Sequence, residues 1–187
     1  MVALVTAAMA SSGCLVLSLQ PAYDAQSVVF DETLLGIWVN AEDQTQATIE
    51  RGEWRSYKVA YKDRFATRVL QGNLTSIGSV TFLDLTEPRG TDAGPFLIPA
   101  HAIVRIELKG DTLSASLLDY GWLSRAMDQK MAGRLAAAFD DRRNAVIASP
   151  TAELRAWLGR VPEEAVSAPM TFRRSRSPAG GGDQRKP

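Results

Sequence analysis

The sequence predicts a mainly β protein of the α+β class, in which an antiparallel meander forms a curled sheet or a barrel and two C-terminal helices pack on it. Between residues 34 and 119, short runs of alternating apolar and polar residues follow one another with turn signals between them. After Asp119 the apolar residues recur at helical spacing instead. With 187 residues, 45% hydrophobic and 22% charged, the chain is long enough for one domain with its own core.

The strand region is a series of short, closely spaced segments. The clearest lies within residues 101–119, where Val104, Ile106 and Leu108 share one face and Gly110 marks a hairpin. About seven strands fit between Trp38 and Asp119, because turn signals separate the segments 34–43, 46–51, 54–62, 65–74, 79–85 and the two halves of 101–119. Strands this close in sequence favour antiparallel neighbours, hence a barrel or a strongly curled sheet.

The helices are expected after the strands. Helical spacing of apolar residues runs through residues 121–140, and a short strand is expected over 144–149. The clearest helix is residues 149–160, with Ser149 placed to cap it and Pro150 at the first helical position. Residues 170–174 are a candidate closing strand. The single β-rich domain therefore spans residues 34–174, and the low-complexity tail 175–187 is expected to be disordered.

The amino-terminal segment has the composition of a secretory signal. No charged residue occurs in residues 1–19, and small residues at 10–13 stand immediately before Cys14. We expect residues 1–13 to be a signal peptide and residues 14–33 to be a lipidated cysteine followed by a tether. The alternative is that Cys14 is a small apolar residue in an uncleaved anchor or a general signal.

Cysteine and histidine usage restricts the chemistry. Cys14 is the only cysteine and His101 the only histidine, so an intrachain disulfide is excluded, as is a structural zinc site of the usual kind. We expect no metal site and no cofactor. A formal net charge of zero argues against nucleic acid as the main partner, which usually needs a strong basic excess.

Two short motifs carry a resemblance to known families. The stretch "ASSGC" resembles a bacterial lipobox, although Ser11 stands where Leu is usual and no Lys or Arg opens the signal. Gly36-Ile37-Trp38 resembles the lipocalin G-x-W signature, which implies that Trp38 packs across the closed end of a barrel. More widely, residues 14–158 resemble a group of bacterial lipoproteins of unknown function.

This resemblance implies a location rather than an activity. It implies a bacterial envelope protein attached to the lipid bilayer through Cys14, whose thiol carries diacylglycerol and whose amine is acylated. Because Leu15 follows the cysteine where Asp would retain the protein, the resemblance implies the outer membrane, facing the periplasm. The group brings no catalytic residues with it.

Candidate chemistry in the domain is sparse. His101 stands at a strand entrance, but no G-x-S-x-G or H-E-x-x-H motif accompanies it, so a structural histidine is favoured and no enzyme activity is expected. Asp84 interrupts an apolar run, and a buried carboxylate needs a partner, for which Arg68 and Arg105 are the candidates.

The loop of residues 86–101 is the longest in the strand region, and long loops are often functional. Phe96, Leu97 and Ile98 would form an apolar lip over a barrel mouth, or else pack on the core as a short edge strand. The candidate ligand-binding residues are Trp38, Phe96, Ile98 and His101. We therefore expect an anchored envelope lipoprotein of unassigned role that binds a small apolar ligand. The alternative is a structural or protein-interaction module of the envelope without a small-molecule site.

Overall fold

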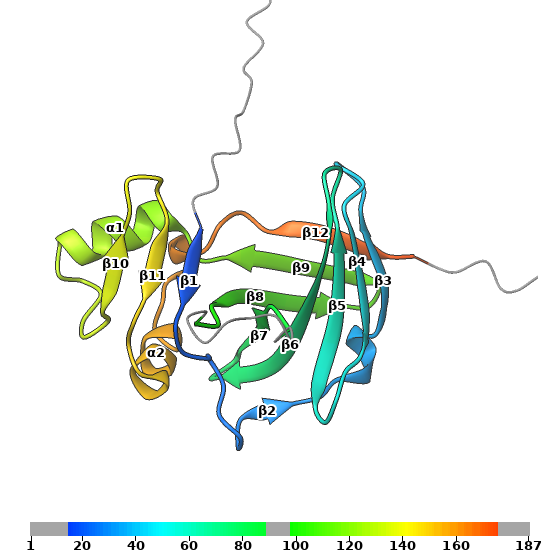
Figure 1. Ribbon diagram of the computed structural model, residues 1–187, viewed down its shortest axis with the longest axis horizontal. Coiled ribbons are helices and arrows are strands. Elements are labelled where there is room, and N and C mark those ends of the chain that lie inside the picture. Colours follow the sequence, from blue (N-terminus) through cyan, green and yellow to red (C-terminus); the bar gives the residue numbers. More distant parts are fainter. Residues whose placement is uncertain (1–14, 89–97, 176–187) are drawn as a thin grey trace, which may run out of the picture.

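Eight antiparallel strands close into a barrel in the computed structural model, which describes residues 15–88 and 98–175 (Figure 1). The barrel strands are β3 (Gly36–Asn40), β4 (Gln46–Arg51), β5 (Ser56–Lys62), β6 (Thr67–Ile77), β7 (Val80–Thr86), β8 (His101–Lys109), β9 (Thr112–Leu117) and β12 (Met170–Arg174). β12 pairs with both β3 and β9, and β9 pairs with β8, so the sheet has no break. The prediction of a mainly β meander is confirmed, and of its two forms the structure has the barrel.

An apolar core fills the inside of the barrel. Trp38 is fully buried there, and its indole N–H donates to the Leu34 carbonyl oxygen at 2.9 Å. The Arg174 guanidinium lies 4.2 Å from the centre of the Trp38 ring and covers it. The buried members of this core are Leu34, Trp38, Ala47, Ile49, Tyr57, Val59, Leu74, Leu83, Val104, Ile106, Leu113, Ala115 and Phe172.

Gly72 shows how closely this interior is packed. A Cβ at Gly72 would lie 3.1 Å from Leu83 Cδ1, 3.3 Å from Leu85 Cδ2 and 3.4 Å from Val59 Cγ2. Such distances are shorter than ordinary carbon contacts, so side chains already occupy the space beside Gly72.

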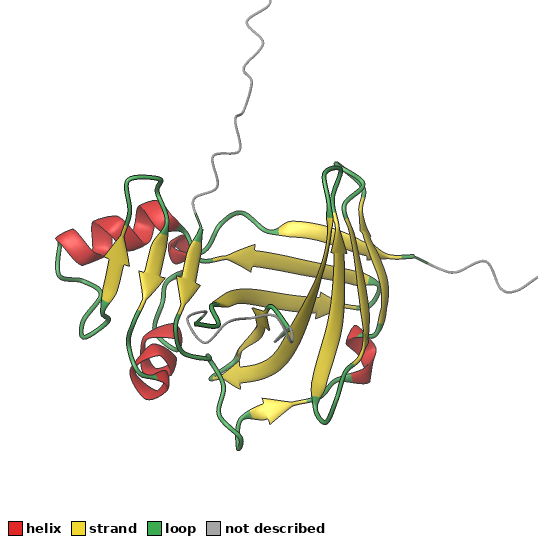
Figure 2. Cartoon of the chain, viewed as in Figure 1, coloured by secondary structure: helices red, strands yellow, loops and turns green. Residues whose placement is uncertain are grey.

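A second layer covers one side of the barrel (Figure 2). It contains β1 (Val16–Ser18), β10 (Ala137–Phe139), β11 (Ala145–Ile147), α1 (Tyr120–Asp128) and α2 (Thr151–Leu158). β1 joins this layer to the barrel, because it pairs with β8 on one edge and, in parallel, with β11 on the other. The remaining elements are β2 (Val28–Val29), which pairs with β6, and the short 3-10 helices η1 (Glu32–Leu34) and η2 (Glu163–Ala165).

The two helices are shorter than the sequence predicts. α1 begins at Tyr120, where the Asp119 carboxylate accepts from the Trp122 backbone N–H at 2.6 Å, and ends at Asp128. Lys130 and Gly133 have φ of +56° and +65°, and this left-handed backbone stops the helix expected to continue to residue 140.

In the second helix, Ser149 does not act as the cap. α2 begins at Thr151, and the Ser149 hydroxyl accepts from the Ala136 backbone N–H at 2.8 Å instead. Ser149 therefore ties the strand region of this layer to the start of α2.

The segment after Cys14 differs from a free tether in its described part. Residues 16–18 form β1, and Ala22 is fully buried in the apolar core between the barrel wall and the second layer. The ordered sheet therefore includes the chain from Val16, through pairing with β11, and Ser18 pairs with the barrel strand β8. Cys14 and the tail 176–187 lie outside the described residues.

Candidate functional site

Asp84 and His101 form a buried hydrogen-bonded pair on the outer face of the barrel wall. Side chains alternate along β7, so Leu83 belongs to the barrel core while Asp84 points outward, beneath the second layer. His101 Nδ1 lies 2.6 Å from Asp84 Oδ1, and Asp84 is fully buried. An ionised carboxylate can only accept a hydrogen bond, so in that state of Asp84 the donor is Nδ1.

The partner of Asp84 is not one of the two arginines expected from the sequence. Arg68 Nη1 lies 3.3 Å from Asp63 in an exposed turn, and Arg105 bonds to Glu163. Both expectations are therefore wrong. The histidine replaces them because the β7–β8 ladder brings Thr86 opposite His101, which places the imidazole beside Asp84 on the same face.

The same carboxylate holds the segment that follows β1. Asp84 Oδ2 accepts from the Ala22 backbone N–H at 2.7 Å. Arg155 Nη1 donates to the Ala22 carbonyl oxygen at 2.6 Å and to Thr75 Oγ1 at 3.0 Å. Both backbone polar groups of one buried residue are thus held, the N–H by β7 and the carbonyl oxygen by α2, and we call this arrangement the Ala22 clamp. Burial, and then the charge of Asp84, raise the pKa of the neighbouring Tyr23.

An Asp–His pair can orient an imidazole for general-base catalysis, which also requires a nucleophile within reach. Ser18 lies opposite His101 in the β1–β8 ladder. Its hydroxyl donates to the Gln20 carbonyl oxygen at 2.7 Å and accepts from the Gln20 N–H at 3.1 Å, so it is engaged in the turn after β1. Among the described residues, the Asp84–His101 pair therefore has structural contacts, which hold the Ala22 segment against the barrel wall.

A groove of about 330 Å³ lies elsewhere on the outer wall, between the β8–β9 hairpin and the segment that contains η2. Its lining residues are Arg105, Ile106, Glu107, Ser114, Ser116, Glu163, Val166, Ser167, Ala168 and Pro169. Arg105 bonds to both carboxylate oxygens of Glu163, at 2.7 and 2.8 Å. These bonds raise the pKa of Arg105 and lower that of Glu163. The groove thus offers hydroxyls and fixed charges to a polar partner, and we call it the outer groove.

The residues predicted as a ligand site are not brought together. Trp38 lies inside the barrel, whereas His101 lies on its outer wall. Ile98 is 70% exposed, and Phe96 lies outside the described residues. The Ala22 clamp and the outer groove carried no local signal in the sequence, because each joins side chains far apart in the chain: Arg155 and Ala22 are 133 positions apart.

Within residues 15–88 and 98–175, no helix is long and apolar enough to span a membrane, and no cluster of three metal-ligating side chains occurs. The chain matches no protein-family model, and no curated protein or solved structure matches it significantly.

Proposed function

We propose that this chain is a lipoprotein of the bacterial envelope, attached to the outer membrane through Cys14, whose barrel serves as a protein-interaction module. The observation that carries the choice of an interaction module is the filled interior: Trp38 and Tyr57 are buried inside the barrel, and side chains crowd the space beside Gly72. We therefore expect a binding partner to contact the outer surface of the barrel.

The anchor is supported by the "ASSGC" stretch and by the position of β1. Leu15 alone separates Cys14 from the first strand. Because a residue spans at most about 3.5 Å, a lipid on Cys14 would hold Val16 within roughly 7 Å of the acylated residue. Several acyl chains together give lasting attachment, whereas a single chain binds marginally.

The outer groove is the surface that we assign to the partner. Its serines and the charges of Arg105, Glu107 and Glu163 suit a polar segment of another envelope protein. Binding of a small apolar ligand stays a prediction, and the side chains inside the barrel are an argument against it. Native mass spectrometry of the purified protein would reveal such a ligand as added mass.

Photocrosslinking in cells tests the proposal. A photoreactive amino acid at Glu107, which lines the outer groove, should give one recurrent protein adduct, whereas the same amino acid at Lys58, exposed on β5, should not. The cells are also labelled with a radioactive fatty acid, which should enter the wild type but not Cys14→Ser. An unlabelled wild type would refute the anchor, and a labelled protein with no adduct at Glu107 would refute the interaction module.

A further inference from the structure

Two aromatic side chains project from the turns at either end of β5. Phe65, between β5 and β6, is 80% exposed, and Trp54, between β4 and β5, is 68% exposed. An arginine lies over each ring: Arg64 is 4.7 Å from the centre of Phe65 and Arg55 is 5.7 Å from that of Trp54. Single exposed apolar side chains are common, so exposure alone gives neither ring a role. The two rings differ, however, in their position relative to the start of β1, the described element nearest to Cys14 in sequence.

The Phe65 turn is closed by hydrogen bonds. Asp63 Oδ1 accepts from the backbone N–H groups of Phe65 and Ala66, at 2.7 and 2.8 Å, and the Asp63 N–H donates to the Ala66 carbonyl oxygen at 3.0 Å. Asp63 is further paired with Arg68. These bonds hold the backbone of the turn in one conformation, which lowers the entropic cost of ordering it on another surface.

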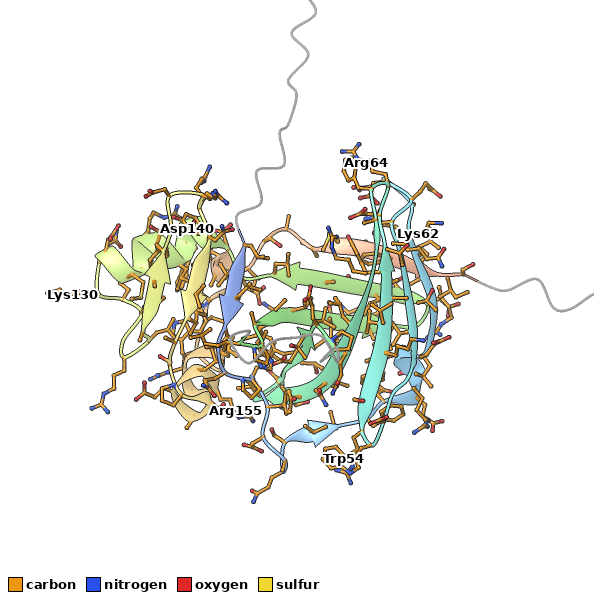
Figure 3. All side chains as sticks on the ribbon, viewed as in Figure 1. Trp54, Lys62, Arg64, Lys130, Asp140 and Arg155 are labelled. Atoms are coloured by element: carbon orange, nitrogen blue, oxygen red, sulfur yellow. The ribbon has the colours of Figure 1, made fainter. Side chains whose placement is uncertain are left out.

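β1, the described element nearest to Cys14 in sequence, begins toward the same end of the molecule as the Phe65 turn. β1 begins toward the end where the β5–β6 turn projects, and Arg64 marks that end, while Trp54 marks the opposite one (Figures 1 and 3). The turn between β10 and β11 also lies beside the start of β1, because the Ala145 N–H donates to the Leu15 carbonyl oxygen at 2.9 Å. A bilayer that holds Cys14 therefore faces this end of the barrel.

The geometry points to the β5–β6 turn as a second membrane contact of the anchored protein, with the Phe65 ring among the lipid headgroups and the Arg64 guanidinium on a lipid phosphate. This inference rests on the proposed anchor at Cys14. Phe is among the residues that segments lying on a bilayer bury at the boundary of headgroups and acyl chains, and a guanidinium matches phosphate geometry. Acidic groups are also near, since Arg64 contributes to the lowered pKa of Asp43, after the larger effect of hydrogen bonds from Thr45. The mixed charge fits a zwitterionic headgroup and needs no anionic lipid.

Exchanging the two aromatics provides the test. The variant Phe65→Trp/Trp54→Phe keeps the composition and moves the exposed indole from one end of the barrel to the other. Lipidated wild type and variant are extracted from membranes and reconstituted in phosphatidylcholine vesicles that contain brominated phosphatidylcholine, which quenches tryptophan only on contact with the bilayer. We expect the loss of emission to be about twofold greater in the exchanged variant, since the other tryptophans are the same in both proteins.

Equal quenching of the two proteins would overturn the inference while leaving the anchor intact, because both would still be recovered with the vesicles. Failure of both to associate with vesicles would overturn the anchor and this inference with it. Circular dichroism checks that the exchanged variant is folded. If it is not, Phe65→Trp alone leaves the Trp54 turn untouched, and its quenching must exceed that of the wild type for the inference to stand.

Discussion

Asp84 is the residue at which the barrel, β1 and the second layer meet. One of its oxygens bonds to His101 and the other accepts from the Ala22 N–H, while Arg155 donates to the Ala22 carbonyl oxygen. An apolar run interrupted by one aspartate predicts a buried, paired carboxylate, and that much is visible in the sequence. The identity of the partner is not, because Arg68, Arg105 and His101 all lie on strands of the barrel and only strand register decides which of them meets Asp84.

Asp84→Asn should destabilise the protein by about 1–3 kcal/mol, because the amide has one acceptor oxygen where the carboxylate has two. With Oδ1 on the Ala22 N–H, the amide NH2 faces His101 Nδ1, and that bond survives only if the imidazole takes the other tautomer. Urea unfolding followed by circular dichroism measures this change. Glu50→Gln is the matched control, since Glu50 and Lys58 are both more than half exposed and their pair contributes little. Equal stability of Asp84→Asn and wild type would mean that the hydrogen bonds of Asp84 do not stabilise the fold.

At the scale of elements, periodicity predicts the type of most segments and fails where the backbone turns left-handed. Seven strands before Asp119 are found as β3 to β9, and Gly110, with φ of +58°, makes the hairpin between β8 and β9. The long helical pattern of residues 121–140 instead divides into α1 and β10. Lysine is a good helix former, so the left-handed conformation of Lys130 gives no signal in the sequence. Ala132 and Leu135, which follow it, are buried beneath the second layer.

η2 is fixed to the barrel by Glu163, whose pKa Arg105 lowers from the ordinary 4.5, first by hydrogen bonding and then by its charge. A carboxylate with a lowered folded-state pKa stabilises the fold above its unfolded pKa, and this contribution is lost as the pH falls through the folded-state value. The wild type should therefore be more stable than Glu163→Gln at neutral pH, and the difference should shrink steadily below pH 4.5. Urea unfolding of both proteins across this range measures it. A difference that stays constant with pH would show that the charge of Glu163 is not what matters.

At the scale of the whole molecule, closure of the barrel depends on a strand that is remote in sequence from its neighbours. Phe172 pairs with Asn40 on one side and with Leu113 on the other, so β12 completes a sheet whose other strands are consecutive. The apolar pattern of residues 170–174 predicts a strand, but local patterns carry no information about which edges it joins. The sequence therefore left an open curled sheet and a closed barrel as alternatives, which only long-range pairing could decide.

Removing β12 should open the barrel. A chain that ends at Pro169 loses the pairing of β3 and β9 with β12, the buried Phe172 and the Arg174 side chain that covers Trp38. It would then expose two sheet edges and part of the core to water, and exposed edges promote aggregation. A chain that ends at Ser175 keeps β12 and the bond from the Ser175 N–H to the Ile37 carbonyl oxygen at 2.7 Å. Thermal unfolding followed by circular dichroism should therefore give an unchanged melting temperature for the chain that ends at Ser175. The shorter chain should show no cooperative transition, and a normal transition from it would mean that the barrel does not need β12 to close.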